Sequence, residues 1–176
     1  MRKRLPEFQS IVQVYAVIAV LFAGWTITAF LWKLSAWLLL LNLGEVFTIF
    51  SYAMAANFLE SLSILLLLLI ACSLLPARVL RDEFVVRGTI LSAGIIGSLM
   101  VFVGSQMYFG IERGVLLLIA PLSVLILTAF LLQRASKLHQ VRSIAVLFSD
   151  RVVVFLFILL PLFAVASIYV LFRNTS

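Results

Sequence analysis

The sequence predicts an all-α integral membrane protein, a bundle of about five transmembrane helices that forms a single domain over residues 1–176. The first observation is composition: 65% of the residues are hydrophobic and 11% are charged, against about 45–50% and about 25% in soluble domains. So short a chain cannot hide that much apolar surface from water. The composition excludes a soluble globular protein and a disordered chain. It also excludes a nucleic-acid-binding domain, despite the net charge of +6.

The second observation is a set of charge-poor runs, each long enough to cross a bilayer. A helix of about 20 residues spans the hydrocarbon core of about 30 Å. The predicted spans cover residues 11–32, 57–75, 88–109, 114–132 and 152–172. The first run follows basic residues, as a signal peptide would, but it is longer than a signal core and no small-residue cleavage site follows it. We expect it to be an uncleaved span, beginning at a capping box formed by Ser10 and Gln13.

The segment Leu34–Ala56 is apolar enough to cross, but it contains Asn42, Gly44 and Glu45. Lys and Arg gather in cytoplasmic loops, and five spans place ten of them inside and three outside. A sixth crossing here would leave five inside and eight outside. We therefore expect an outer-leaflet interfacial or re-entrant segment. Whether it stays separate, or continues from Glu45 as one long helix through Leu75, is left open.

This topology predicts a multi-pass protein of the cell membrane, with its N-terminus in the cytoplasm and its C-terminus outside. The acidic residues balance the basic ones on the outer side, so the whole net charge of +6 lies on the cytoplasmic side. The anionic inner leaflet is therefore an expected partner, and nucleic acid is not.

Small residues in the third span predict a surface for close helix packing. Gly inside a helix costs up to about 1 kcal/mol relative to Ala, so several of them invite a packing explanation. The pattern consists of one stripe and its neighbours: Ala93, Gly97 and Gly104, with Gly94, Ser98 and Ser105 beside them. They could pack against helices of the same chain, or seat another subunit or a lipid tail.

The inner segment Gln133–Asp150 has an approximate apolar face and two arginines, Arg134 and Arg142. That face is made by Leu138, Val141, Ala145 and Phe148. Such a pattern is typical of an interfacial helix on anionic headgroups, and equally of a basic loop that follows the positive-inside bias. Ser149 or Asp150 would then cap the final span.

Glu60 is the candidate functional residue, because an ionisable group within the membrane usually has a partner. If the second span starts at Asn57, Glu60 lies about 4–5 Å below the outer boundary. Lys33 is the expected counter-ion and Glu45 a further member of this outer site. The alternative is an ordinary interfacial acid that faces headgroups.

Catalytic patterns are missing from the sequence. It contains one His, His139, and one Cys, Cys72, so it offers no multi-histidine metal site and no His-dependent dyad. We expect no enzyme activity, no metal site and no cofactor. The predicted function is a non-catalytic subunit or scaffold of a larger complex, with other membrane subunits as partners. The alternative is a small-solute or lipid transporter, or its membrane-embedded substrate-binding component.

Overall fold

The computed structural model describes residues 6–75, 80, 83–109, 115–135 and 139–175. Within these ranges the chain forms helices only: α1 (Phe8–Leu40), α2 (Leu43–Leu74), α3 (Phe84–Phe109), α4 (Val115–Ala135) and α5 (His139–Thr175). The prediction of an all-α protein is confirmed. In the described ranges, α1, α2, α3 and α5 are each long and apolar enough to cross a membrane.

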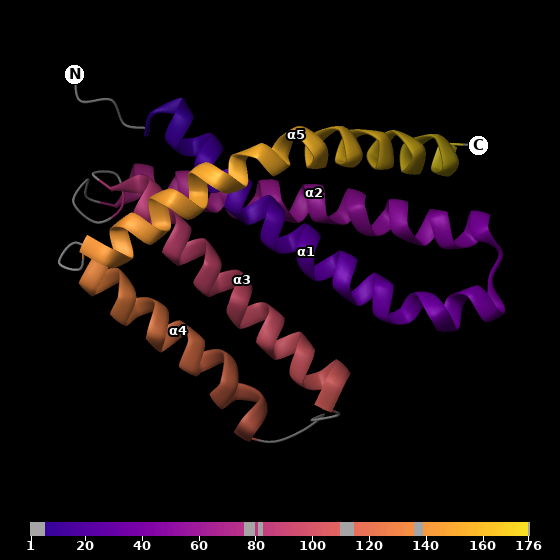
Figure 1. Cartoon of the computed structure of the whole chain (residues 1–176), viewed down its shortest axis with the longest axis horizontal. Coiled ribbons are helices and arrows are strands. Elements are labelled where there is room, and N and C mark those ends of the chain that lie inside the picture. Colours follow the sequence, from indigo (N-terminus) through magenta and orange to yellow (C-terminus); the bar gives the residue numbers. More distant parts are fainter. Residues whose placement is uncertain (1–5, 76–79, 81–82, 110–114, 136–138, 176) are drawn as a thin grey trace.

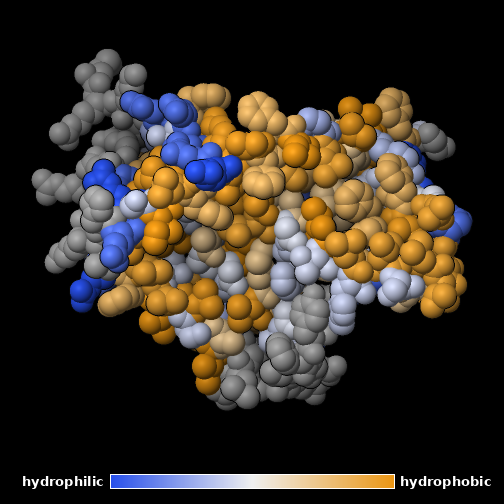
Figure 2. Space-filling view, viewed as in Figure 1, coloured by the Kyte–Doolittle hydropathy of each residue, from blue (hydrophilic) through white to orange (hydrophobic). Residues whose placement is uncertain are grey.

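The helices run back and forth along the molecule (Figure 1). α1, α3 and α5 run away from the end where α1 begins, and α2 and α4 return toward it, so α1 begins and α5 finishes at opposite ends. The α3–α4 pair splays away from α1 and α2 toward the far end. Figure 2 shows hydrophobic side chains over most of this face, with hydrophilic ones gathered mainly at the end where α1 and α5 begin. Such a surface suits lipid contact.

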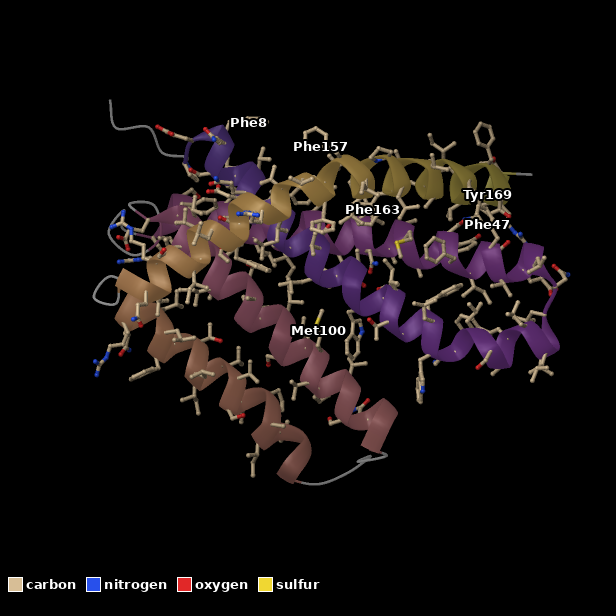
Figure 3. The ribbon with its side chains drawn as sticks, in the orientation of Figure 1. Phe8, Phe47, Met100, Phe157, Phe163 and Tyr169 are labelled. Carbon is tan, nitrogen blue, oxygen red and sulfur yellow. The ribbon has the colours of Figure 1, made fainter. Side chains whose placement is uncertain are left out.

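α1 is the central helix, and its buried side chains join two apolar clusters. One cluster packs α1 against α2 and α5; it holds the small residues Ala16 and Ala19 of α1 together with Phe163 of α5, which is fully buried. Figure 3 shows Phe163 pointing back into the bundle, while Phe157 of the same helix points outward. The Phe163 ring lies 5.8 Å from that of Phe58 on α2. The other cluster packs Val14 of α1 against α2 and α3.

The segment Leu34–Ala56 is not a separate element, since its first part ends α1 and its last part begins α2. A tight turn at residues 41–42 joins the two helices. The Asn42 side chain accepts a hydrogen bond from the Glu45 backbone N–H, and the Glu45 carboxylate accepts one from the Asn42 N–H. This capping box satisfies the free donors of a helix start. Of the two versions left open by the sequence, the long second helix is the one observed, beginning at Leu43 rather than at Glu45.

Two predicted helix starts are wrong. α5 runs without interruption through Ser149 and Asp150, so neither residue caps a new helix. α1 begins at Phe8, before the predicted capping box at Ser10 and Gln13. The Gln13 amide instead donates to the Asp150 carboxylate, which ties α1 to α5, while the Ser149 hydroxyl donates to the Val146 carbonyl within α5. One residue of each predicted cap therefore takes part in a contact between helices.

The other end of α5 is fastened to the start of α2. The hydroxyl groups of Thr48 and Tyr169 lie 3.0 Å apart, and Arg173 donates to Thr48 Oγ1 at 2.6 Å. The Tyr169 ring also meets Phe47 edge to face, a pair labelled in Figure 3. Contacts at both ends hold α5 along the α1–α2 pair.

Candidate functional site

The candidate site is a groove of about 650 Å³ that has α1 as its floor and α2 and α3 as its walls. Figure 1 shows α1 lying between the two wall helices. In Figure 3, Met100 points from α3 toward α1, into this region. We call it the α2–α3 groove; its lining residues are Phe22, Trp25, Thr26, Ala53, Ala56, Asn57, Leu59, Glu60, Ser63, Ile64, Ile96, Leu99, Met100 and Val103.

Asn57 brings an unpaired polar atom to the wall of the groove. Its side chain is 3% exposed. The Thr26 hydroxyl donates to Asn57 Oδ1 at 2.9 Å, while the amide Nδ2 has no hydrogen-bond partner. Turning the amide over would only exchange the two atoms, so one of them stays unpaired either way. A buried amide atom without a partner costs about 1–3 kcal/mol.

Glu60 lies one helical turn from Asn57, on the exposed side of α2, and its side chain lines the groove. The pairing of Thr26 with Asn57 sets its position along α1. Thr26 is six residues before Trp32, the end of the first predicted span, which is about 9 Å along the axis. Glu60 is a further turn along α2, so it lies about 13 Å along the axis from the level of Trp32. The predicted depth of 4–5 Å assumed that the second span starts at Asn57, whereas α2 begins at Leu43.

The structure does not bring Lys33 and Glu45 to Glu60. Lys33 is exposed beyond Trp32 on α1, about 15 Å from Glu60 along the helix axis. Glu45 is occupied by the cap of α2. Among the described residues, the ion pairs join Glu83 to Arg87 and Arg142 at the opposite end of the molecule. Of the three predicted site residues, Glu60 alone lines the groove.

The small residues of α3 lie mainly against α4. A Cβ atom built on Gly94 would lie 2.1 Å from Thr128 Oγ1, and Ser98 donates to the Pro121 carbonyl at 3.1 Å. A Cβ on Gly97 would make only ordinary contact, 3.8 Å from Val124. The other three small residues differ in their surroundings. Ala93 is exposed and Gly104 is buried, while the Ser105 hydroxyl donates to the Phe102 carbonyl within α3. The closest approach therefore lies at Gly94.

The groove offers a carboxylate, an unpaired amide atom and two hydroxyls in mostly apolar surroundings. Such a set can bind and orient a polar group, and it carries no nucleophile–base pair. No cluster of three or more metal-binding side chains occurs within the described ranges. Cys72 is buried between α1, α2 and α3, and the side chain of His139 lies outside the described residues.

Sequence reasoning missed the contribution of Asn57 and Thr26. Both were visible as polar residues near or within charge-free runs, and Asn57 lies one turn from Glu60. Their meeting depends on the register between α1 and α2, which the capping turn at Asn42 determines. Comparison with known proteins adds no further assignment, because no family model, curated protein or solved structure matches this chain.

Proposed function

We propose that this chain is a non-catalytic subunit of a membrane complex and that its α2–α3 groove receives a transmembrane helix of a partner subunit. The observation that supports this most directly is that Glu60 and Asn57, whose amide Nδ2 has no hydrogen-bond partner, both line the groove one helical turn apart.

The cost of leaving these groups against lipid supports an occupied groove. A charged carboxylate at the bilayer centre costs several kcal/mol, and an amide atom without a partner adds about 1–3 kcal/mol. Lipid tails offer no hydrogen bonds. A helix that carries a basic side chain opposite Glu60 and an acceptor opposite Asn57 would remove both penalties.

The small side chains on the α2 wall also favour a partner helix as the occupant of the groove. Ala53, Ala56 and Ser63 line the groove on the same wall as Glu60. Helices approach closely in membranes where small residues face the partner. A neighbouring backbone could therefore come near enough for short polar contacts with Asn57.

A second candidate is a small amphipathic solute or lipid bound in the same groove, as in a transporter or its substrate-binding component. The volume of about 650 Å³ favours it, because small-molecule sites measure about 300–1,000 Å³ and combine apolar walls with a few polar groups.

We also propose that all five helices cross the cell membrane, with the start of α1 in the cytoplasm and the end of α5 outside. α4 has 21 residues, about 32 Å, which matches the hydrocarbon core. Arg87, Arg134 and Arg142 lie at or next to the helix ends on the proposed inner side. This placement follows the positive-inside bias.

The test is site-specific photo-cross-linking in the native membrane. A photoreactive leucine analogue replaces Leu59, which lines the groove and is 65% exposed. The matched control is Ile158 on α5, which is 66% exposed and lies outside the groove. We expect Leu59 to give one product of defined mass, mapping to a transmembrane segment of another chain that contains Lys or Arg.

Glu60→Gln should weaken that cross-link by about 3- to 30-fold, the range measured for polar contacts between membrane helices. Glu7→Gln serves as the matched control, because Glu7 is an exposed acid before α1 with no side-chain cap bond. A small molecule that co-purifies with the wild type but not with Glu60→Gln, without a protein cross-link, would instead establish the second candidate. Equal cross-linking at Leu59 and Ile158, with no bound molecule, would refute both.

A further inference from the structure

A second groove lies on a different face of α3, among α3, α4 and α5. Its volume is about 410 Å³ and nearly all of its lining is apolar. We call it the α3–α5 groove; Thr89 and Ala93 line it from α3, Leu131 from α4, and Val141 and Phe148 from α5. The face of α5 that the sequence assigned to the membrane surface therefore forms one of its walls.

Thr89 lines this groove and carries an unsatisfied donor just beneath its surface. Its residue is 6% exposed, and its hydroxyl Oγ1 is buried without a hydrogen-bond partner. It lies one residue after Gly88, where the third predicted span begins, and in the topology proposed above this is the inner boundary. In that topology, on which the inference rests, Thr89 lies at the level of the phospholipid ester carbonyls, between the headgroup and the acyl chains.

Two arginines flank the inner end of the groove. Arg134 is exposed one turn beyond Leu131, with its guanidinium 5.2 Å from the centre of the Phe130 ring. Arg142 follows Val141, and its side chain is 61% exposed. Glu83 lies 3.7 Å from Arg142 and 3.6 Å from Arg87, so this carboxylate is shared between two guanidinium groups. Among the described residues, Arg134 and the exposed part of Arg142 place positive charge at this end of the groove.

We propose that the α3–α5 groove binds an anionic phospholipid of the inner leaflet. The headgroup phosphate contacts Arg134 and Arg142, the Thr89 hydroxyl donates to an ester carbonyl, and one acyl chain lies against Ala93 and Leu131. Arginine binds phosphate through charge-assisted hydrogen bonds. The charge, the donor and the apolar channel follow one another in the order in which a phospholipid presents its phosphate, ester and chain.

The experiment measures lipid retention by native mass spectrometry on the full chain. The protein is purified in mild detergent with equal amounts of phosphatidylglycerol and phosphatidylcholine that carry the same acyl chains. We expect the wild type to retain phosphatidylglycerol preferentially. Each arginine near the membrane surface contributes about fivefold to anionic lipid binding, so the R134Q/R142Q double variant should lose about 25-fold of the preference.

Three further variants separate a built site from surface charge. K33Q/R151Q removes the same charge from residues that do not line the groove and should keep the preference. Ala93→Leu fills the groove from an exposed position and should lower retention of both lipids, whereas Ala129→Leu, exposed on α4 outside the lining, should not. Thr89→Val should lower retention about fivefold while it stabilises the lipid-free protein, because it removes an unsatisfied hydroxyl.

Equal lipid preference in the wild type and R134Q/R142Q would overturn the proposal, and so would an equal loss in K33Q/R151Q. Wild-type retention in both Ala93→Leu and Thr89→Val would show that no lipid enters the groove, and would overturn it as well. The proposal is independent of the α2–α3 groove, so Glu60→Gln should leave phosphatidylglycerol retention unchanged.

Discussion

Replacing Gly94 with Ala should destabilise the protein more than any other Gly→Ala change among those whose surroundings are described. The added Cβ would lie 2.1 Å from Thr128 Oγ1, 2.3 Å from its Cγ2 and 2.7 Å from its Cβ. Rotating the Thr128 side chain moves the first two atoms but leaves the third. Ordinary contact begins at 3.4 Å, so α3 and α4 would have to separate by about 0.7 Å.

Forced overpacking of this kind costs about 1–3 kcal/mol. Ala is favoured over Gly in a helix by up to about 1 kcal/mol, which offsets part of the cost. Separation would also stretch the bond from Ser98 to the Pro121 carbonyl, one turn away, worth about 1 kcal/mol. We expect a net loss of about 1–3 kcal/mol in the free energy of unfolding.

Reversible unfolding in mixed detergent micelles measures this loss. Gly97→Ala is the matched control on the same helix, because its Cβ would lie 3.8 Å from Val124; it should be neutral or stabilising. In a Thr128→Ala background the cost of Gly94→Ala should fall by about 1 kcal/mol or more, since two of the three clashing atoms are gone. Equal effects of Gly94→Ala and Gly97→Ala, or no coupling to Thr128, would refute the assignment of the closest α3–α4 contact.

Two further predictions concern the ends of the helices. Reporter fusions after Ala135 and after Ser176 should be active on the cytoplasmic and outer sides respectively; cytoplasmic activity of the second would contradict five crossings. Asn42→Ala should cost about 0.5–2 kcal/mol and speed hydrogen exchange at the first amides of α2, because it removes the capping box. Glu7→Ala, at a helix start whose cap makes no side-chain bond, should change stability less, and an equal loss would show that the box contributes nothing.

The features of the fold that depend on composition could be predicted from the sequence. Those that depend on how packed helices are aligned along one another could not. Charge-free runs predicted the all-α class and the approximate position of each long helix, since lipid admits little else. The turn at Asn42 was harder to interpret. Its polar residues interrupt an apolar run, and in a sequence such an interruption reads equally well as a surface segment or as a hairpin between two long helices.

The candidate site shows the same limit. Glu60 could be identified because an acid in a span is rare, but the helix that carries it begins at Leu43, well before the predicted span. Thr26 and Asn57 meet only because α1 and α2 pack in one register. Gln13 and Asp150 resembled cap residues because caps use the same side chains, whereas their contact spans 137 residues of chain. Local patterns carry no information about such partners.

The unequal lengths of the helices impose a condition on the surrounding bilayer. α1 has 33 residues and α2 has 32, close to 50 Å each, whereas α4 has 21, about 32 Å. The far end of the long pair remains apolar, with Leu39, Leu40 and Leu43 more than three-quarters exposed. In the proposed topology, in which all five helices cross the membrane, the hydrophobic belt is therefore tall on one flank and short on the other. Lipids there must stretch, or the long pair must tilt, at a cost of fractions of a kcal/mol per Å of mismatch. Two molecules that turn their tall flanks toward one another would share the distorted lipids, so we expect this mismatch to favour thicker membranes and lateral clustering.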